Sequence, residues 1–204
     1  METIKYLLVM IGSYLLGSVS FSIMLSRGVL GRDVRAMGSG NAGATNMARV
    51  YGMGAGALTL AGDMLKAAVP MLVGFLLLGD TGMAVAGISC IVGHCYPVYY
   101  GFRGGKGVSV GAALAFAVDW RAALLVLGVF LAVALASRKV SLGSVCAAIT
   151  LPAAAMIFGA SAPRLIMSLA GMFFVVLRHR ENLRRLVKGT EPDFKPGRQK
   201  KKEQ

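Results

Sequence analysis

Two long stretches without a single ionisable side chain constrain this chain most, residues 67–79 and residues 122–137. Over the whole chain 56% of the residues are hydrophobic and only 15% are charged, whereas about a quarter are charged in soluble domains. A helix needs about 20 mostly apolar residues to cross the hydrocarbon core of a bilayer, and several segments reach or approach that length. The sequence therefore predicts an all-α, polytopic membrane protein.

Seven segments have the composition expected of membrane-spanning helices. They are residues 5–25, 55–78, 83–100, 107–118, 122–137, 141–159 and 163–178. The fourth is short for a full crossing and follows glycine-rich sequence, so it is either tilted or begins inside a re-entrant loop. The first is longer than the apolar core of a signal peptide and lacks a strongly basic start, so we interpret it as a retained helix. We expect one membrane domain, residues 1–188, followed by a basic cytoplasmic tail, residues 189–204.

Lys and Arg are distributed unevenly between the two sides that these spans define. One set of connections and span ends holds 18 of them, whereas the opposite set holds only Lys5, Arg121 and Arg164. Connections rich in Lys and Arg stay in the cytoplasm, which predicts an N-terminus outside and a C-terminus in the cytoplasm. The net charge of +13 follows from this bias and from a tail suited to anionic lipid. It does not indicate a nucleic-acid partner, because no stacking aromatic residues accompany the tail.

The first polar cluster spans residues 38–49, Gly-Ser-Gly-Asn-Ala-Gly-Ala-Thr-Asn-Met-Ala-Arg, and lies on the predicted cytoplasmic side. Its small residues allow the backbone to fold tightly and to bring N–H groups close to an anion. Neutral hydrogen-bonding groups come from Ser39, Asn41, Thr45 and Asn46. Arg49 adds a planar cationic group that suits phosphate. This combination predicts a phosphate site.

The second cluster, residues 101–107, places four glycines around Arg103 and Lys106. It lacks the full Gly-x-x-x-x-Gly-Lys-Ser/Thr pattern of nucleotide-binding loops, and no strand precedes it. We therefore expect anion binding without nucleotide hydrolysis.

The third cluster follows the last span. His179 and Asn182 are three residues apart and share a face on a helix that continues from the span. Arg184 and Arg185 are interpreted as interfacial anchors. In the second span Asp63 and Lys66 have the spacing of an ion pair that faces the protein interior, and Ser141 begins the sixth span on the cytoplasmic side.

These three clusters, in this order and on one face, closely resemble the bacterial acyl-phosphate:glycerol-3-phosphate acyltransferase family (PlsY-type). The resemblance extends from Gly17-Ser18 to Gly189-Thr190-Glu191, and residues 38–49 carry its most specific part. It departs at Ser20, where proline is expected, at Ala67, where glycine is usual, and at Tyr96, which replaces a common phenylalanine. The resemblance implies seven helices in a bacterial cytoplasmic (inner) membrane, with the active site on the cytoplasmic side.

The implied reaction transfers a fatty acyl group from acyl phosphate to the 1-hydroxyl of sn-glycerol 3-phosphate, which yields lysophosphatidic acid and phosphate without a covalent acyl-enzyme. This would be the first committed step of bacterial phospholipid synthesis. The residues expected to act in catalysis are Ser39, Arg49, Lys106, His179 and Asn182. The residues expected to contact substrate are Gly38, Gly40, Asn41, Thr45, Asn46, Asp63, Lys66, Gly104, Gly105, Gly107 and Ser141. Glu191 is expected to be structural.

No metal or cofactor is expected, because acyl phosphate is already an activated mixed anhydride. The base is either a phosphate oxygen of the substrate or His179, and the sequence leaves both open. The expected partners are the two substrates, membrane lipid, and a transient contact with the soluble enzyme that makes acyl phosphate. An anion transporter is disfavoured because no internal repeat is found. A metal-dependent head-group transferase is disfavoured because the aspartates are scattered over both faces.

Overall fold

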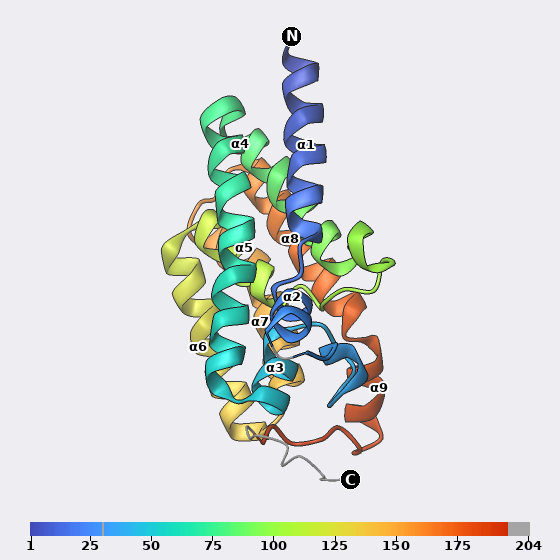
Figure 1. The fold of residues 1–204 in the computed structure, drawn as a ribbon. Helices are drawn as coiled ribbons and strands as arrows, with labels where there is room; N and C mark the ends of the chain where they lie inside the picture. Colours follow the sequence, from blue (N-terminus) through green and yellow to red (C-terminus); the bar gives the residue numbers. More distant parts are fainter. Residues whose placement is uncertain (30, 196–204) are drawn as a thin grey trace.

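The computed structural model describes residues 1–29 and 31–195. Within these residues all regular secondary structure is helical, without a strand, which confirms the predicted all-α class (Figure 1). The α-helices are α1 (Glu2–Ser18), α2 (Phe21–Gly28), α3 (Ala44–Tyr51), α4 (Met53–Cys95), α5 (Val108–Val118), α6 (Trp120–Ser137), α7 (Val140–Ile157), α8 (Ala162–Arg178) and α9 (Arg180–Val187). Two 3-10 turns, Val34–Ala36 and Val98–Tyr100, lie in the connections.

Within the described residues, four helical stretches are long and apolar enough to cross a membrane, and a bent pair of helices makes a fifth. The four are Glu2–Gly28, Met53–Tyr100, Trp120–Ser137 and Val140–Ile157, and the pair is α8 with α9. Helix α5 has 11 residues, about half of what a full crossing requires. The count of seven spans and the orientation of the termini stay predictions.

Helix α4 is a hairpin that accounts for two of the predicted spans. Gly79 has φ 62° and ψ −152°, a conformation that only glycine adopts readily, and the chain turns back there. The two legs lie together, since Lys66 Nζ is 3.0 Å from His94 Nδ1. The second leg ends at Cys95, five residues before the predicted end. Tyr96 precedes a proline and takes φ −131° and ψ 66°, because a following proline disfavours the helical conformation.

The predicted first span, residues 5–25, is two helices and not one. Val19 is extended between α1 and α2, and the side chain of Ser20 caps α2 by accepting a hydrogen bond from the Ile23 backbone N–H. The break leaves the Val19 carbonyl without a helical partner, and Lys66 Nζ donates to it at 2.5 Å. Ser20 therefore supplies a helix N-cap at the position where proline was expected.

The predicted continuous helix through residues 178–182 is also wrong. Helices α8 and α9 meet at an angle of 57°, with His179 at the junction. In Figure 1, α9 lies at the lower right of the molecule.

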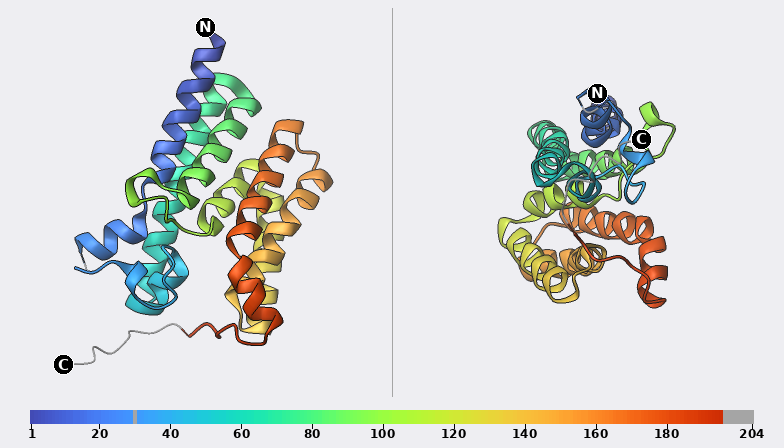
Figure 2. Two further views of the ribbon diagram at one scale, coloured as in Figure 1. Left: turned by 90° about the vertical axis from the view of Figure 1, so that its right-hand side faces the viewer. Right: turned by 60° about the horizontal axis from the view of Figure 1, so that its bottom comes forward.

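The core and the outer surface are both apolar. Helices α4, α5 and α8 pack around Ile91, Val110, Leu114 and Met167, all of which are fully buried. In Figure 2, α1 and α4 lie on one side and α7 and α8 on the other, with α5 between them. Large leucines on outer faces remain exposed, with Leu76 at 73% and Leu135 at 76%. An exposed apolar surface of this extent is the surface expected to face lipid.

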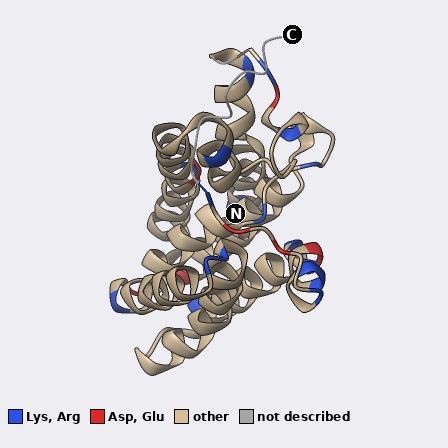
Figure 3. Ribbon diagram, turned by 90° about the horizontal axis from the view of Figure 1, so that it is seen from below, with Lys and Arg blue, Asp and Glu red and all other residues tan. Residues whose placement is uncertain are grey.

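The two ends of the helical bundle differ in charge. At the end that carries the N-terminus, Asp80 accepts hydrogen bonds from Ser161 at 2.5 Å and from Arg164 at 2.9 Å. The opposite end carries α2, α3, α9 and the connections rich in Lys and Arg. Seen from below in Figure 3, blue Lys and Arg segments outnumber red Asp and Glu segments at that end. The division of basic residues inferred from the sequence therefore corresponds to two ends of one molecule.

Candidate active site

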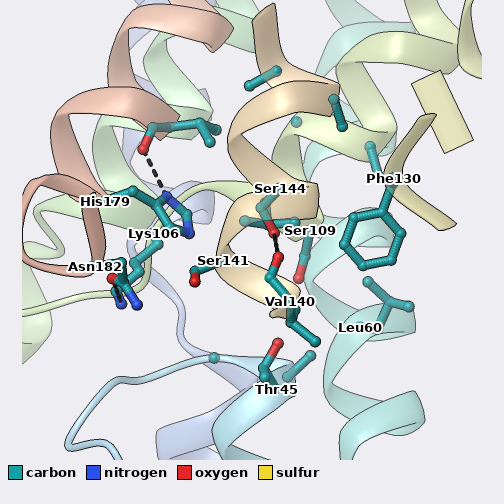
Figure 4. Close-up of a pocket in the computed structure, with 18 of the residues that line it drawn as sticks. Thr45, Leu60, Lys106, Ser109, Phe130, Val140, Ser141, Ser144, His179 and Asn182 are labelled. Carbon is teal, nitrogen blue, oxygen red and sulfur yellow. Dashed lines mark hydrogen bonds between the residues drawn. The ribbon is translucent and has the colours of Figure 1, made fainter. Parts of the chain in front are cut away.

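A cavity of about 490 Å³ opens between the helices at the basic end, within the size range of small-molecule sites. Most of the residues predicted to act in catalysis or binding contribute to its lining, although they come from widely separated parts of the chain. These are Ser39, Asn41, Thr45, Asn46, Arg49, Lys106, Ser141, His179 and Asn182, and Glu191, predicted to be structural, also lines the cavity. Figure 4 shows His179, Lys106 and Asn182 together on one side of this space.

The other predicted residues lie behind the lining. The glycines Gly38, Gly40, Gly104, Gly105 and Gly107 belong to the loops that support the cavity, and Asp63 and Lys66 form an ion pair inside α4. None of these seven is among the lining residues in the described part of the chain. Asp63 and Lys66, which were predicted to contact substrate, therefore lie outside the lining of this cavity, and their contact with substrate stays a prediction.

The first loop, residues 31–43, is held in shape by Asn46. Its side-chain Nδ2 donates to the carbonyls of Val34 (3.1 Å), Met37 (3.0 Å) and Asn41 (3.0 Å), and its Oδ1 accepts from the Ser39 N–H at 2.9 Å. Asn46 is 1% exposed. Its amide is occupied by the loop backbone, which gives Asn46 a structural role, and its predicted contact with substrate stays a prediction.

Arg35 joins the first loop to the second loop, residues 96–107. Its guanidinium donates to the carbonyls of Tyr100 (3.1 Å) and Arg103 (3.2 Å) and pairs with Asp33 at 2.9 Å. The hydrogen bonds from Arg35 hold the pKa of Asp33 at about 2. Because Asp33 stays ionised, Arg35 stays oriented toward the second loop.

Arg178 joins the second loop to α8. It donates to the carbonyls of Gly105 (3.2 Å) and Gly104 (3.3 Å), and its guanidinium lies 5.2 Å from the centre of the Tyr96 ring. Gly105 also packs against the His94 ring, where a Cβ would collide with Nε2. The three predicted clusters are therefore connected to one another by arginines.

Lys106, Asn182 and Glu191 form a network at the polar end of the cavity. Lys106 Nζ donates to Asn182 Oδ1 at 2.5 Å, and Asn182 Nδ2 donates to Glu191 Oε1 at 2.6 Å. Glu191 also accepts from Ser141 (2.6 Å) and from Arg185 (2.7 Å). Burial alone would raise the pKa of Glu191, but these three hydrogen bonds outweigh it and hold the pKa below its ordinary value. The carboxylate thus orients the amide that positions Lys106.

Lys106 lies close to other cationic side chains. Burial, followed by the nearby charge of Arg185, lowers the pKa of Lys106 to about 8. Arg49 and Arg185 line the same cavity, against one lining carboxylate, Glu191. Within residues 1–29 and 31–195, Arg49 makes no hydrogen bond or ion pair through its side chain. This excess of positive charge favours an anionic ligand.

His179 is fixed at the bend between α8 and α9. Its Nδ1 lies 2.8 Å from the Val175 carbonyl (Figure 4), so Nδ1 carries a proton and donates, because a carbonyl oxygen only accepts. Burial lowers the pKa of His179 to about 4. The ring is therefore neutral at pH 7, with Nε2 as an acceptor.

The tail strap, residues 188–195, closes one wall of the cavity. Lys139 Nζ donates to the Glu191 carbonyl and, at 2.6 Å, to Asp193 Oδ1. The Phe194 N–H donates to the Arg138 carbonyl at 3.0 Å. Pro192 and Phe194 contribute to the lining. The predicted bracing role of Glu191 agrees with this arrangement, and the predicted basic residues from 196 onward lie outside the described residues.

The remainder of the cavity is apolar. Its lining continues from the polar end along α4, α5, α6 and α7 through Leu60, Phe116, Leu127, Phe130 and Leu151. In Figure 4, Leu60 and Phe130 lie on the side away from His179 and Lys106. One cavity therefore joins a cationic end to an apolar arm.

Sequence reasoning missed three residues of this site. Arg185, interpreted as an interfacial anchor, instead pairs with Glu191 and lines the cavity, whereas Arg184 is 71% exposed and pairs with Glu181. Arg178 and His94 also went unassigned. The spacing of Arg185, three residues after Asn182, places both on one helix face and was the one available signal.

The donor set does not resemble a metal site. Among the described residues, no three His, Cys, Asp or Glu side chains gather where they could hold one ion. The titratable groups of the cavity instead pair with one another or face its centre as cations.

Comparisons with known proteins identify the family. The model of the glycerol-3-phosphate acyltransferase family matches residues 7–189. The glycerol-3-phosphate acyltransferase of Rubrobacter xylanophilus is 42% identical over 192 residues, which cover 94% of this chain and 96% of that protein. That of Syntrophotalea carbinolica is 39% identical over 194 residues, with 94% and 98% covered.

Two solved structures are similar to the whole fold. Both are of PlsY, an integral membrane glycerol 3-phosphate acyltransferase. The glycerol 3-phosphate form aligns with a TM-score of 0.88 at 36% identity, covering 94% of this chain and 96% of that one. The lysophosphatidic acid form aligns with a TM-score of 0.87 at 35% identity and the same coverage. With a family match over nearly its full length and an integral membrane relative of the same fold, this chain belongs to the glycerol-3-phosphate acyltransferase family.

Proposed function

We propose that this protein transfers a fatty acyl group from acyl phosphate to the 1-hydroxyl of sn-glycerol 3-phosphate and releases lysophosphatidic acid and phosphate. The observation that carries the proposal is the continuity of the cavity, which joins a cationic end at Arg49, Lys106 and Arg185 to an apolar arm along α4 to α7. A substrate with a phosphate head and a long acyl chain matches both parts. The solved PlsY structures, with glycerol 3-phosphate and lysophosphatidic acid forms, support the same acceptor and the same lipid product.

The cations overcome the repulsion between two phosphates. Two unit charges 4 Å apart repel by about 4 kcal/mol near a protein surface, and each phosphate carries more than one charge at pH 7. Three cationic side chains around the cavity offset this repulsion and hold the acceptor hydroxyl about 3 Å from the acyl carbonyl. Positioning and charge stabilisation are then the main contributions of the protein.

A substrate phosphate oxygen is the favoured base. Burial lowers the pKa of His179 to about 4, below the second pKa of a phosphate monoester at about 6. His179 Nε2 faces this reaction as a hydrogen-bond acceptor that orients the attacking hydroxyl. The hydroxyl attacks the carbonyl directly, its proton passes to phosphate, and the acyl–phosphate bond breaks to release inorganic phosphate.

Ser39 acts as a hydrogen-bond donor in this scheme and not as a nucleophile. The described residues provide no base hydrogen-bonded to its hydroxyl, and its backbone N–H is held by Asn46 Oδ1 at 2.9 Å. An activated serine needs such a base. Replacing Ser39 by Cys should therefore trap no acyl-protein adduct, and a mass increase equal to the acyl chain would refute direct transfer.

The site is proposed to face the cytoplasm in the bacterial inner membrane. The support is the basic end of the molecule (Figure 3), which follows the rule that Lys and Arg stay inside. Acyl phosphate would reach the apolar arm from the bilayer or from the soluble enzyme that makes it. Reporter fusions at Gln204 and near Asp80 should report opposite sides of the membrane.

One assay tests the proposed reaction. Purified protein in detergent or lipid mesophase is given acyl phosphate and glycerol 3-phosphate in the presence of a chelator, and phosphate and lysophosphatidic acid are measured. Equal amounts of both products are expected. Acyl-coenzyme A in place of acyl phosphate serves as the control donor, and comparable turnover with it would contradict the proposal.

A further inference from the structure

Lys66 determines the tautomer of a buried histidine next to the cavity. The ammonium group of Lys66 carries three N–H donors and no acceptor. It donates to the Val19 carbonyl at 2.5 Å and contacts His94 Nδ1 at 3.0 Å. Because Lys66 can only donate, His94 Nδ1 must accept. The proton of the neutral His94 ring therefore lies on Nε2.

Asp63 is the counter-charge of Lys66. The carboxylate lies 2.8 Å from Lys66 Nζ, and both groups are almost fully buried. The contact with Lys66 lacks the alignment of a hydrogen bond, and neither Asp63 oxygen has another hydrogen-bond partner within the described residues, so the carboxylate acts as a counter-charge. His94 Nδ1 is 3.9 Å from Asp63 Oδ1, too far for a hydrogen bond, which excludes the alternative in which Nδ1 donates to Asp63.

The opposite edge of the His94 ring lies where the first loop, residues 31–43, meets the second loop, residues 96–107. His94 contributes to the cavity lining. A Cβ at Gly105 would collide with His94 Nε2 and lie 2.7 Å from the Ala42 carbonyl, so Nε2 lies beside residues of both loops. The Gly105 N–H also donates to the His94 carbonyl at 3.0 Å. Nε2–H is left as a donor without a partner in the described part of the chain.

We propose that His94 is a substrate-binding residue whose Nε2–H donates a hydrogen bond to the phosphoryl group of a substrate, and that Lys66 and Asp63 are positioning residues that hold this tautomer. The proposal rests on the proposed function for the identity of the anion. It also divides the work of the two histidines. His94 presents a donor to the cavity, whereas His179, with its proton on Nδ1, presents an acceptor.

The first test measures the tautomers without any turnover. Protein labelled with 15N-histidine contains two imidazoles, and its 15N spectrum at pH 7.5 should show one Nε2–H ring and one Nδ1–H ring. His94→Gln should remove the Nε2–H signals. Finding His94 as an Nδ1–H ring or as an imidazolium would overturn the proposal, whatever the enzymatic activity.

The second test identifies the phosphoryl group. Glycerol 3-phosphate and a non-hydrolysable acyl phosphonate are titrated separately into the labelled protein. A shift of the His94 Nε2 resonance with either ligand supports the proposal and assigns the contact to that substrate. If saturating amounts of both ligands leave the resonance unchanged, the proposal is wrong, even where acyl transfer itself is observed.

Kinetics of matched variants test whether the donor matters. Losing one hydrogen bond to a charged group should lower kcat/KM of His94→Phe about thirtyfold, through KM for the substrate whose phosphate it contacts. His94→Gln keeps an N–H donor near the position of Nε2 and should stay within about fivefold of the native protein. Equal losses in both variants, with unchanged KM values, would overturn the proposal. In Lys66→Met, the 15N spectrum should show both neutral tautomers of His94. An unaltered spectrum would show that Lys66 does not hold the Nε2–H tautomer.

Discussion

Raising the pH should weaken the use of glycerol 3-phosphate through one side chain, Lys106. Burial and the charge of Arg185 lower its pKa from 10.5 to about 8, so deprotonation begins within the range in which activity can be measured. With a pKa of about 8, about nine-tenths of the free enzyme carries the charge at pH 7 and about one-tenth at pH 9. If the ammonium is required for phosphate binding, kcat/KM should fall about tenfold between these values.

The assay follows phosphate release at subsaturating glycerol 3-phosphate from pH 6.5 to 9.5, with enzyme-free hydrolysis of acyl phosphate subtracted. Lys106→Arg is the matched variant, because arginine stays charged throughout this range. The fall in kcat/KM near pH 8 should be absent from this variant. Its activity should be lower than that of the native protein at every pH, since a planar guanidinium fits the ammonium position poorly. A native profile that is flat to pH 9.5 would refute the reasoning, and so would a limb that persists in Lys106→Arg.

Four further changes test other parts of the site. Arg49→Ala should lower kcat/KM about a thousandfold, because a charged hydrogen bond in the cavity is worth several kcal/mol, and rescue to near-native rates by Arg49→Lys would contradict a planar phosphate contact. Gly105→Ala should mainly raise KM for glycerol 3-phosphate, since the added Cβ collides with the His94 ring. A fall in kcat with unchanged KM would contradict this prediction. His179→Ala should lower kcat/KM by less than about tenfold and leave its pH profile unchanged above pH 5, because the pKa of His179 is about 4. If the native profile falls below about pH 6.5 and the variant lacks that fall, His179 is the base. Glu191→Ala should lower the free energy of unfolding by about 3 kcal/mol, measured as a lower midpoint of thermal unfolding, and Glu191→Gln should lower it less. Equal midpoints for the native and Glu191→Ala proteins would contradict the structural role of Glu191.

Apolar length predicted the helices well because it is a local property. Residues 122–137 and 163–178 correspond closely to α6 and α8, since bilayer thickness alone determines their extent. The break at Val19 and the bend at His179 went unrecognised. Both depend on partners distant in sequence, Lys66 for the Val19 carbonyl and the tail strap beside α9, and helical periodicity carries no information about such partners.

The candidate site was predictable where residue chemistry was concentrated in one segment. Residues 38–49 and 101–107 combine glycines with a cation, so they could be predicted to bind an anion directly from the sequence, and the structure places Arg49 and Lys106 in one cavity. His94 and Arg185 could not be assigned in this way. The role proposed for His94 depends on a contact across 28 residues to Lys66, and the place of Arg185 in the site depends on a carboxylate beyond the end of its own helix.

The tail strap makes the spacing between α9 and Glu191 a restraint on how this sequence can vary in length. Each inserted or deleted residue in an extended segment moves the chain by about 3.3 Å, more than the 2.6 Å bonds from Glu191 to Ser141 and Asn182 can absorb. An insertion between Val187 and Glu191 would therefore release Asn182 and, through it, Lys106. Phe194 carries the last backbone N–H that is tied to the helical bundle in the described residues, so the restraint on length covers the chain from Val187 to Phe194.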